Sequence, residues 1–164
     1  MTSHQHQIWD IAQKRVRQLL KSHTRDINRL AFSPNGRFLV SASFDHSVRL
    51  WSIRDGSSKR ASSGDYFGST AFHPSGRYFA AGNFDHVVRI WDARTMRLVT
   101  SWTGQGGCVW CMMFMPDGKE LVCGSTDGVL KYWDMSSLGE KDPVEIRRFE
   151  GHSVRVLLDF LFFF

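Results

Sequence analysis

The sequence predicts an all-β fold that is assembled from repeated four-stranded sheets. A tryptophan returns at intervals of 42, 40 and 42 residues, at Trp9, Trp51, Trp91 and Trp133. A turn of the form Pro-x-Gly lies in each of the units that end at the last three tryptophans, and no segment has a convincing helical period of 3.6 residues. A repeat of about 40 to 45 residues is typical of units that contain four short strands.

Each repeated unit shows the same succession of elements. The turns at 34–36, 74–76 and 116–118 combine a proline, which fixes φ, with a glycine, which adopts conformations that other residues resist. Such turns join antiparallel strands. The stretches after them, up to Ser43, Asn83 and Ser125, are short and apolar, as expected of strands covered on both faces. The stretches that end at the repeated tryptophans alternate apolar and polar residues, which favours strands nearer to solvent.

The same pattern defines the domain organisation. It predicts a segment of repeats over residues 7–153, between a disordered N-terminus, 1–6, and an atypical apolar tail, 154–164. The segment divides into a partial unit, three full repeats and the start of a further unit: 7–22, about 23–62, 63–103, 104–138, and 144–153. The tail is about half as long as a bilayer requires and Asp159 interrupts it, so it predicts an aggregation-prone end and no membrane anchor.

Composition and charge limit the class of protein. The chain is 42% hydrophobic and 13% aromatic, which is enough for packed sheets. Three cysteines give no disulfide framework and the N-terminus lacks the features of a secretory signal, so we expect an intracellular protein of the nucleus or cytoplasm. Residues 14–25 are basic within a net charge of +5. No recognition helix or zinc module accompanies them, so direct nucleic-acid binding is not expected.

Cys108 and Cys111 have the spacing of a zinc or redox pair. A second cysteine pair is missing from the sequence, and the histidines are scattered over different units. The sequence therefore predicts neither a metal site nor a cofactor.

The repeated units resemble the WD-repeat β-propeller family. The resemblance covers roughly residues 7–153 and rests on the pairs Trp9-Asp10, Trp91-Asp92 and Trp133-Asp134, and on an aspartate six residues before each later tryptophan. Gly151-His152 adds the opening of a further unit. A closed ring of seven such units needs about 280 to 300 residues. The resemblance therefore implies an incomplete, open propeller, with three full four-stranded blades and partial units at both ends.

The resemblance also implies a buried chain of hydrogen bonds in the first unit, formed by His23, Ser43, Asp45 and Trp51. By alignment, the second unit has Ser63 and Asn83 in place of the histidine and serine. The third unit has Gln105 in place of the histidine and keeps the remaining positions, which are Ser125, Asp127 and Trp133. His23, Ser43 and Asp45 are also the residue types of a hydrolase triad. A structural role is favoured because the aspartate and tryptophan recur in units that lack the histidine.

In WD-repeat proteins, partners commonly dock on the face that displays the residue before the turn aspartate and two residues early in the first strand. Carried onto this chain, that set predicts a partner-binding site made of Asp26, Asn28, Phe44, Tyr66, Phe84, Trp110 and Thr126. Phenylalanine is unusual in tight turns, which favour small polar residues, and exposed aromatic residues often anchor interfaces. The alternative is that each phenylalanine folds back over its own blade.

The expected function is a non-enzymatic scaffold for protein–protein interactions. Residues 78–92, in a unit without the histidine, are similar to the fungal Tup-type general transcriptional corepressors, which implies DNA-bound transcription factors or chromatin proteins as partners. A cytoplasmic scaffold and a substrate adaptor of a ubiquitin ligase stay open, as does a serine hydrolase from a different class. Open blade faces also predict self-association, because they expose apolar area.

Overall fold

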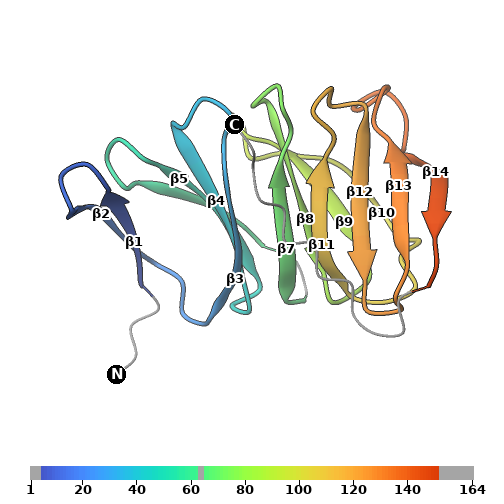
Figure 1. Cartoon of the computed structure of the whole chain (residues 1–164), viewed down its shortest axis with the longest axis horizontal. Helices are drawn as coiled ribbons and strands as arrows, with labels where there is room; N and C mark the ends of the chain where they lie inside the picture. The colour runs from blue at the N-terminus through green and yellow to red at the C-terminus, as the bar shows by residue number, and fades with distance from the viewer. Residues whose placement is uncertain (1–4, 63–64, 152–164) are drawn as a thin grey trace.

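The computed structural model describes residues 5–62 and 65–151, and within these ranges it contains fourteen strands and no helix. The strands form one two-stranded sheet and three four-stranded antiparallel sheets, which stand side by side in chain order (Figure 1). The row is open, with the two-stranded sheet at one end and the third blade at the other. The prediction of an all-β, open propeller is confirmed. The described part of the chain offers no helix that could cross a membrane.

Consecutive strands make up each sheet. The two-stranded sheet contains β1 (Gln5–Asp10) and β2 (Arg15–Lys21). The first blade contains β3 (Ile27–Phe32), β4 (Phe38–Ser43), β5 (Ser47–Ser52) and β6 (Ser58–Ser62). The second contains β7 (Phe67–Phe72), β8 (Tyr78–Asn83), β9 (Val88–Asp92) and β10 (Leu98–Trp102). The third contains β11 (Val109–Phe114), β12 (Glu120–Ser125), β13 (Leu130–Asp134) and β14 (Val144–Phe149).

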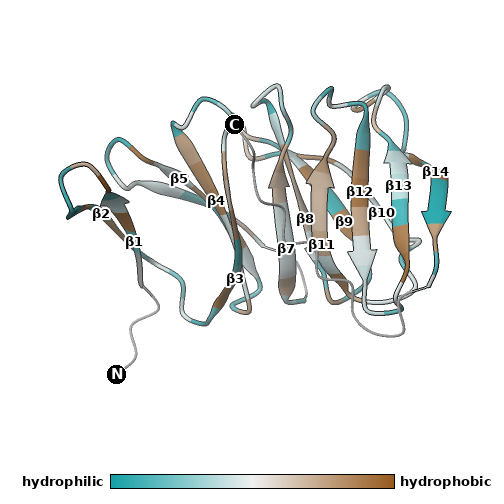
Figure 2. Ribbon diagram, viewed as in Figure 1, coloured by the Kyte–Doolittle hydropathy of each residue, from teal (hydrophilic) through white to brown (hydrophobic). Residues whose placement is uncertain are grey.

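Two predicted boundaries are wrong. Residues 144–149 do not open a further unit, because β14 pairs with β13 and completes the third blade. β14 is largely exposed and carries little apolar signal, and Figure 2 shows it as largely hydrophilic. Gln5 and His6 belong to β1, which pairs with β2, although residues 1–6 were predicted to be disordered. Residues 1–4 and the predicted tail lie outside the described residues.

The Pro-x-Gly turns have the geometry that their sequence predicts. Gly36, Gly76 and Gly118 adopt φ values of 65°, 69° and 75°, in the left-handed region where a side chain is unfavourable. Each glycine N–H also closes its turn; that of Gly36 donates to the carbonyl of Ser33 at 2.8 Å. These turns align β3 with β4, β7 with β8, and β11 with β12.

The repeated tryptophans lie between successive sheets. Trp51 packs with Leu20 of the two-stranded sheet, Trp91 belongs to a cluster that contains Leu50 of the first blade, and Trp133 belongs to a cluster that contains Ile90 of the second. These three indoles are 2 to 5% exposed. Each therefore packs against the preceding sheet, and burial of so large an apolar side chain contributes about 1.5–3 kcal/mol.

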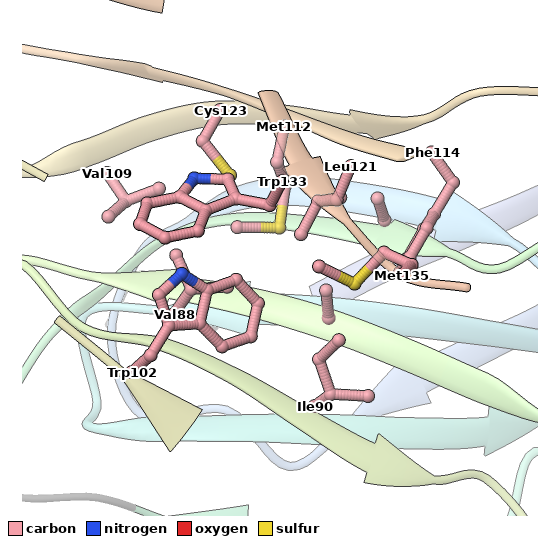
Figure 3. Packing of buried hydrophobic residues seen from close by; sticks show 12 residues of the cluster. Val88, Ile90, Trp102, Val109, Met112, Phe114, Leu121, Cys123, Trp133 and Met135 are labelled. Carbon is pink, nitrogen blue, oxygen red and sulfur yellow. The ribbon is translucent and has the colours of Figure 1, made fainter. Parts of the chain in front are cut away.

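The seam between the second and third blades is closely packed. In Figure 3, Trp102 and Trp133 lie near each other with Met112 and Met135 beside them, and the two indole centroids are 5.4 Å apart. At Gly82 a β-carbon would lie only 2.4 Å from Cγ1 of Val109. The strands approach this closely because residue 82 has no side chain.

Candidate partner-binding surface

The first blade contains a buried chain of hydrogen bonds centred on His23. Nδ1 of His23 lies 2.7 Å from Oδ2 of Asp45, and Nε2 lies 2.6 Å from Oγ of Ser41. The indole N–H of Trp51 donates to the same Oγ at 2.8 Å. Because this oxygen accepts from the indole, its own hydrogen is available for Nε2, and Nδ1–H then donates to the carboxylate. The chain connects the turn before β5 with the core of the blade.

Ser43 is not part of this chain, and its predicted place in the tetrad is wrong. Its hydroxyl donates to the carbonyl of Asp26 at 2.8 Å, and Ser41 occupies the position between histidine and tryptophan. Both serines lie on β4 two residues apart, so they share one face of the strand. At the equivalent positions the second and third blades carry Ala81 and Cys123.

The third blade therefore lacks the chain that alignment with Ser125 suggested. Ser125 donates to Asp127 instead. Nε1 of Trp133 and both polar atoms of the Gln105 side chain are buried without a hydrogen-bond partner among the described residues. Among the residues that the structure describes, only the first blade shows such a chain from its tryptophan to its turn aspartate.

The environment of Asp45 keeps its carboxyl group ionised. Burial raises the pKa of Asp45, but hydrogen bonds from Ser47 and His23 together with the backbone N–H of Thr24 outweigh it, and the net pKa lies below the ordinary value of 3.8. Hydrogen bonds to a charged acceptor are stronger than neutral ones. This carboxylate is thus a fixed structural acceptor.

The geometry of these residues argues against nucleophilic catalysis. Ser41 and Ser43 are both fully buried and His23 is 6% exposed, so no substrate reaches either hydroxyl. The Trp51 indole N–H also donates to Oγ of Ser41, and a serine that acted as a nucleophile would have to give up this hydrogen bond. The residue types of a triad are present, but they are enclosed within one blade.

The predicted partner-binding positions are brought together by one repeated hydrogen bond. The backbone N–H of Phe44 donates to the carbonyl of Asp26, and that of Phe84 donates to the carbonyl of Tyr66, both at 3.0 Å. In the third blade Thr126 donates to Cys108 at 3.1 Å. In each blade this bond ties the turn after the second strand to the start of the first strand. We call the end of the sheets that carries these turns the top face.

Four aromatic residues form a continuous ridge on the top face, which we call the aromatic ridge: Phe44, Tyr66, Phe84 and Trp110. Phe44 contacts Tyr66 and Phe84 edge-on, with ring centroids 5.5 and 5.6 Å apart. Phe84 in turn lies 5.2 Å from Trp110 in the same arrangement. All four side chains are half-buried. Edge-to-face packing of this kind is favourable for aromatic rings.

The rings pack across blade boundaries. Phe44 of the first blade contacts Tyr66 and Phe84 of the second, and Phe84 contacts Trp110 of the third. The alternative in which each phenylalanine folds back over its own blade does not describe these contacts. One face of the ridge is therefore used inside the molecule, while all four rings stay partly exposed.

A shallow hollow of about 550 Å³ lies over the ridge. It is lined by Phe44, Tyr66 and Phe84 and by the exposed side chains of Arg25 and Asp26. Nη1 of Arg25 lies 3.3 Å from the Tyr66 hydroxyl, with the guanidinium 5.8 Å from the ring centroid. The hollow thus combines an apolar floor with one cation and one anion.

Two predicted positions have structural contacts of their own. Nδ2 of Asn28 donates to the carbonyl of Phe67 at 2.7 Å, which joins the first blade to the second. The exposed Thr126 accepts from the N–H of Cys108 at 3.0 Å. The sequence analysis does not include Arg25 or His46 in the partner-binding site. Both lie beside Tyr66, and the ring centroids of His46 and Tyr66 are 4.5 Å apart. They come close to Tyr66 because the first blade packs against the second, and no local sequence motif predicts how two blades pack.

The cysteines do not form a metal centre. Within residues 5–62 and 65–151, no group of three or more histidine, cysteine or acidic side chains could hold a metal ion. Cys108, Cys111 and Cys123 form no disulfide within these residues. Burial and the nearby Cys111 raise the pKa of Cys123, so its thiol stays protonated and unreactive.

Comparison with known proteins identifies the family. Residues 13–52, 61–92 and 96–134 match WD40, the "WD domain, G-beta repeat" family. The chain belongs to this WD-repeat family. Its members are generally non-enzymatic scaffolds for protein–protein interactions. The predicted tie to Tup-type corepressors has no specific support among the similar proteins.

Curated relatives match one part of the chain each. Ribosome assembly protein 4 of Saccharomyces cerevisiae is 54% identical over 37 residues, which are 23% of this chain and 7% of that protein. Set1 complex component swd1 of Schizosaccharomyces pombe is 44% identical over 50 residues, 30% of this chain and 13% of that protein. The small ribosomal subunit protein RACK1 of Trypanosoma brucei brucei is 49% identical over 37 residues, 23% and 12% of the two chains. The matches thus span a small fraction of each relative.

Proposed function

We propose that this chain is a non-enzymatic interaction module that binds a protein partner on the aromatic ridge. The observation that carries the proposal is the ridge itself, in which four half-buried rings from three sheets meet beside an open hollow. Rings that are already packed on one side lose little conformational freedom when a partner covers the other. Rigid aromatic residues with one open face are typical anchors of interfaces.

The charged residues beside the ridge would orient a bound partner. Arg25 and Asp26 stand at the same hollow as Phe44, so an apolar side chain of the partner would lie on the rings while its flanking polar groups meet both charges. We expect an extended peptide segment with one apolar anchor. Charges at the rim of an interface affect specificity and association rate more than affinity.

As the finer function, we propose a role in a transcriptional corepressor, with DNA-bound transcription factors or chromatin proteins as partners. Its support is the similarity of residues 78–92 to Tup-type corepressors. Further support is that one relative, matched over 30% of this chain, is named as a component of the Set1 complex. We correspondingly propose an intracellular protein of the nucleus or cytoplasm, in keeping with relatives that are named for ribosome assembly and the small ribosomal subunit.

A double substitution of the ridge tests the binding site. Phe44→Ala with Phe84→Ala removes the two central rings and is expected to lower capture of bound proteins at least tenfold in affinity purification. Phe32→Ala is the matched control, because Phe32 is 57% exposed and lies at the opposite end of β3, next to the 34–36 turn. Far-UV circular dichroism and a thermal melt show that both variants are folded. Equal capture by the double variant and the wild type would show that the ridge is not the binding site.

Identification of the captured proteins tests the finer role. Enrichment of transcription factors or chromatin proteins in the wild type, with their loss in the ridge variant, is the expected result. Enrichment of other proteins by the same ridge would leave the interaction module in place and contradict the corepressor role. A fluorophosphonate probe should not label Ser41 or Ser43, and labelling of either would favour the hydrolase.

A further inference from the structure

Each blade carries a cation two residues before its repeated tryptophan, namely Arg49, Arg89 and Lys131. In the second blade Nη2 of Arg89 lies 2.8 Å from Oδ2 of Asp85. In the third blade Nζ of Lys131 lies 3.1 Å from Oε2 of Glu145. A carboxylate of the same blade therefore pairs with the cation in the second and third blades.

The first blade is different, because Arg49 forms no ion pair within residues 5–62 and 65–151. The turn aspartate of this blade, Asp45, bonds to His23 and Ser47 instead. Nη1 of Arg49 donates to a neutral acceptor, Oγ of Ser58, at 3.2 Å. Nε of Arg49 is buried and has no hydrogen-bond partner in the described part of the chain.

A second cation lies directly opposite Arg49. β6 pairs antiparallel with β5, which places Arg60 opposite Arg49 and Ser62 opposite Ser47. Side chains that lie opposite each other, or two residues apart on one strand, share a face of the sheet. Burial lowers the pKa of Arg49, the charge of Asp45 opposes this, and the charge of Arg60 lowers the pKa further. Ser62 therefore stands beside two like charges, two residues from Arg60 and diagonal to Arg49.

The third blade shows how an anion can join such a pair of cations. There Arg148 lies opposite Lys131, and the carboxylate of Glu145 lies 3.1 Å from Nζ of Lys131 and 3.8 Å from Nε of Arg148. The first blade has Ser58 in the place of Glu145, since each lies opposite the repeated tryptophan. The two arginines of the first blade thus have an uncharged residue where the third blade has an acid.

The residues before Ser62 form a substrate pattern of basophilic protein kinases. These kinases recognise a serine that basic residues precede by two and three positions, as Arg60 and Lys59 do here. Ser62 and both basic residues are exposed, and β6 is the outermost strand of its sheet. The pattern therefore lies on an accessible edge of the first blade.

We propose that Ser62 is a phosphorylation site of a basophilic protein kinase and that the phosphate binds Arg49 and Arg60. The kinase transfers the γ-phosphoryl group of ATP to Oγ of Ser62. The bond between the γ-phosphorus and ADP breaks, the bond to Oγ forms, and the hydroxyl proton passes to the base of the kinase. A phosphoserine carries about −1.5 to −2 charges, and arginine binds phosphate oxygens in a bidentate way. The modification supplies the missing anion and joins β6 to β5.

The other charges around Ser62 leave the site positive. Asp45 bonds to Ser47, which lies opposite Ser62, but its carboxylate already accepts from His23. Asp65 accepts from the backbone N–H of Tyr66 at 2.7 Å. β2, whose Leu20 packs on this face of the blade, contains three cations and no acid. The cations near the site are Arg49, Lys59 and Arg60, with those of β2, against these two acids.

Phosphorylation of the folded chain tests the site. With ATP, Mg²⁺ and the catalytic subunit of cAMP-dependent protein kinase, mass spectrometry is expected to show one phosphate and to place it on Ser62. Ser62→Ala should lower the initial rate at least tenfold. Ser101→Ala is the matched control, because Ser101 is an exposed serine of the outer strand β10 and no basic residue precedes it by two or three positions. A chain that accepts no phosphate, accepts it only after denaturation, or accepts it on another residue in place of Ser62 would overturn the proposal.

Thermal unfolding tests whether the two arginines bind the phosphate. Phosphorylation is expected to raise the melting midpoint by about 2–4 °C at low salt, and by less at high salt because salt screens the charges. Arg49→Gln leaves the kinase pattern intact, so it should be phosphorylated at the wild-type rate but lose most of this rise. Arg54→Gln, at an exposed arginine outside the pair, is the matched control and should keep it. A midpoint that phosphorylation does not raise, or an equal rise in Arg49→Gln, would contradict binding of the phosphate by this pair.

Discussion

The first and third blades have the same strand order but stabilise their central tryptophan in different ways. In the first blade the Trp51 indole donates to Ser41, and His23 extends the contact to Asp45. In the third blade the Trp133 indole has no acceptor among the described residues and packs against Trp102 and the surrounding methionines. Both indoles are almost fully buried.

The two blades show that the fold requires the buried tryptophan but not the hydrogen-bond chain. A blade requires a large apolar side chain between two sheets, because this side chain fills the seam. The hydrogen-bond chain adds stability where all its members are present. Where Gln105 replaces the histidine, the blade retains buried polar atoms that have no hydrogen-bond partner in the described part of the chain, which costs free energy.

The largest effect is expected from the residue at the centre of the chain. His23→Leu removes the hydrogen bonds of this side chain to the buried Ser41 hydroxyl and to the Asp45 carboxylate, and should lower the free energy of unfolding by roughly 2–4 kcal/mol. The equivalent change in the third blade, Gln105→Leu, removes unsatisfied polar atoms and should be neutral or stabilising. Urea denaturation measures both. A larger loss for Gln105→Leu than for His23→Leu would contradict the contrast.

The pH dependence of stability should reveal the Asp45 carboxylate. The folded-state pKa lies below the ordinary value of 3.8, so the carboxylate stabilises the fold fully above that value, and this contribution is lost as pH falls through the folded-state pKa. Asp45→Asn should cost about 1–2 kcal/mol at pH 7, since a charged acceptor becomes neutral. The difference between the variant and the wild type should shrink below pH 3.8. A stability difference between Asp45→Asn and the wild type that does not change with pH would show that the charge of Asp45 does not contribute to stability.

Shortening the tryptophans tests the indole hydrogen bond directly. Trp51→Phe and Trp133→Phe remove similar apolar volume, but only Trp51→Phe also leaves Ser41 without a donor. The first variant should therefore be less stable than the second by about 1 kcal/mol. Thermal unfolding followed by circular dichroism gives the comparison. Equal losses would show that the Trp51 bond contributes nothing beyond packing.

The smallest effect is expected from supplying an acceptor in the third blade. Cys123 holds the place of Ser41, and Cys123→Ser sets a hydroxyl on the face that packs with Trp133. Stability should rise by about 0.5 kcal/mol if the hydroxyl meets the indole N–H. Ala81→Ser is the control in the second blade, where Ser63 stands at the predicted histidine position. A loss of stability for Cys123→Ser would mean that the site favours the thiol.

The repeat made most of the fold predictable from sequence. Tryptophan spacing and Pro-x-Gly turns report local backbone geometry, and these features align the first three strands of every blade. β14 is largely exposed and carries no comparable signal, which is why the sequence pattern assigns it to a further unit although it pairs with β13. A strand of this kind is recognised only by its neighbour in the sheet.

The sites were less predictable for two physical reasons. Ser41 and Ser43 point to the same side of β4, and sequence alone does not tell which of them the Trp51 indole reaches. The positions of Phe44, Tyr66 and Phe84 followed from the family resemblance, but their mutual packing depends on how one blade lies against the next. Whether a partner covers them remains a proposal for the capture experiment.

The bare backbone at Gly82 limits how freely the blades could be rearranged. Its place in the first blade is held by Ala42, and the two positions face different neighbours. If the first blade were repeated in place of the second, the methyl group of Ala42 would lie against Val109, closer than two non-bonded carbon atoms can approach. Duplication of such units can lengthen the protein only if each junction is refitted, so the copies are modular in sequence but matched in pairs.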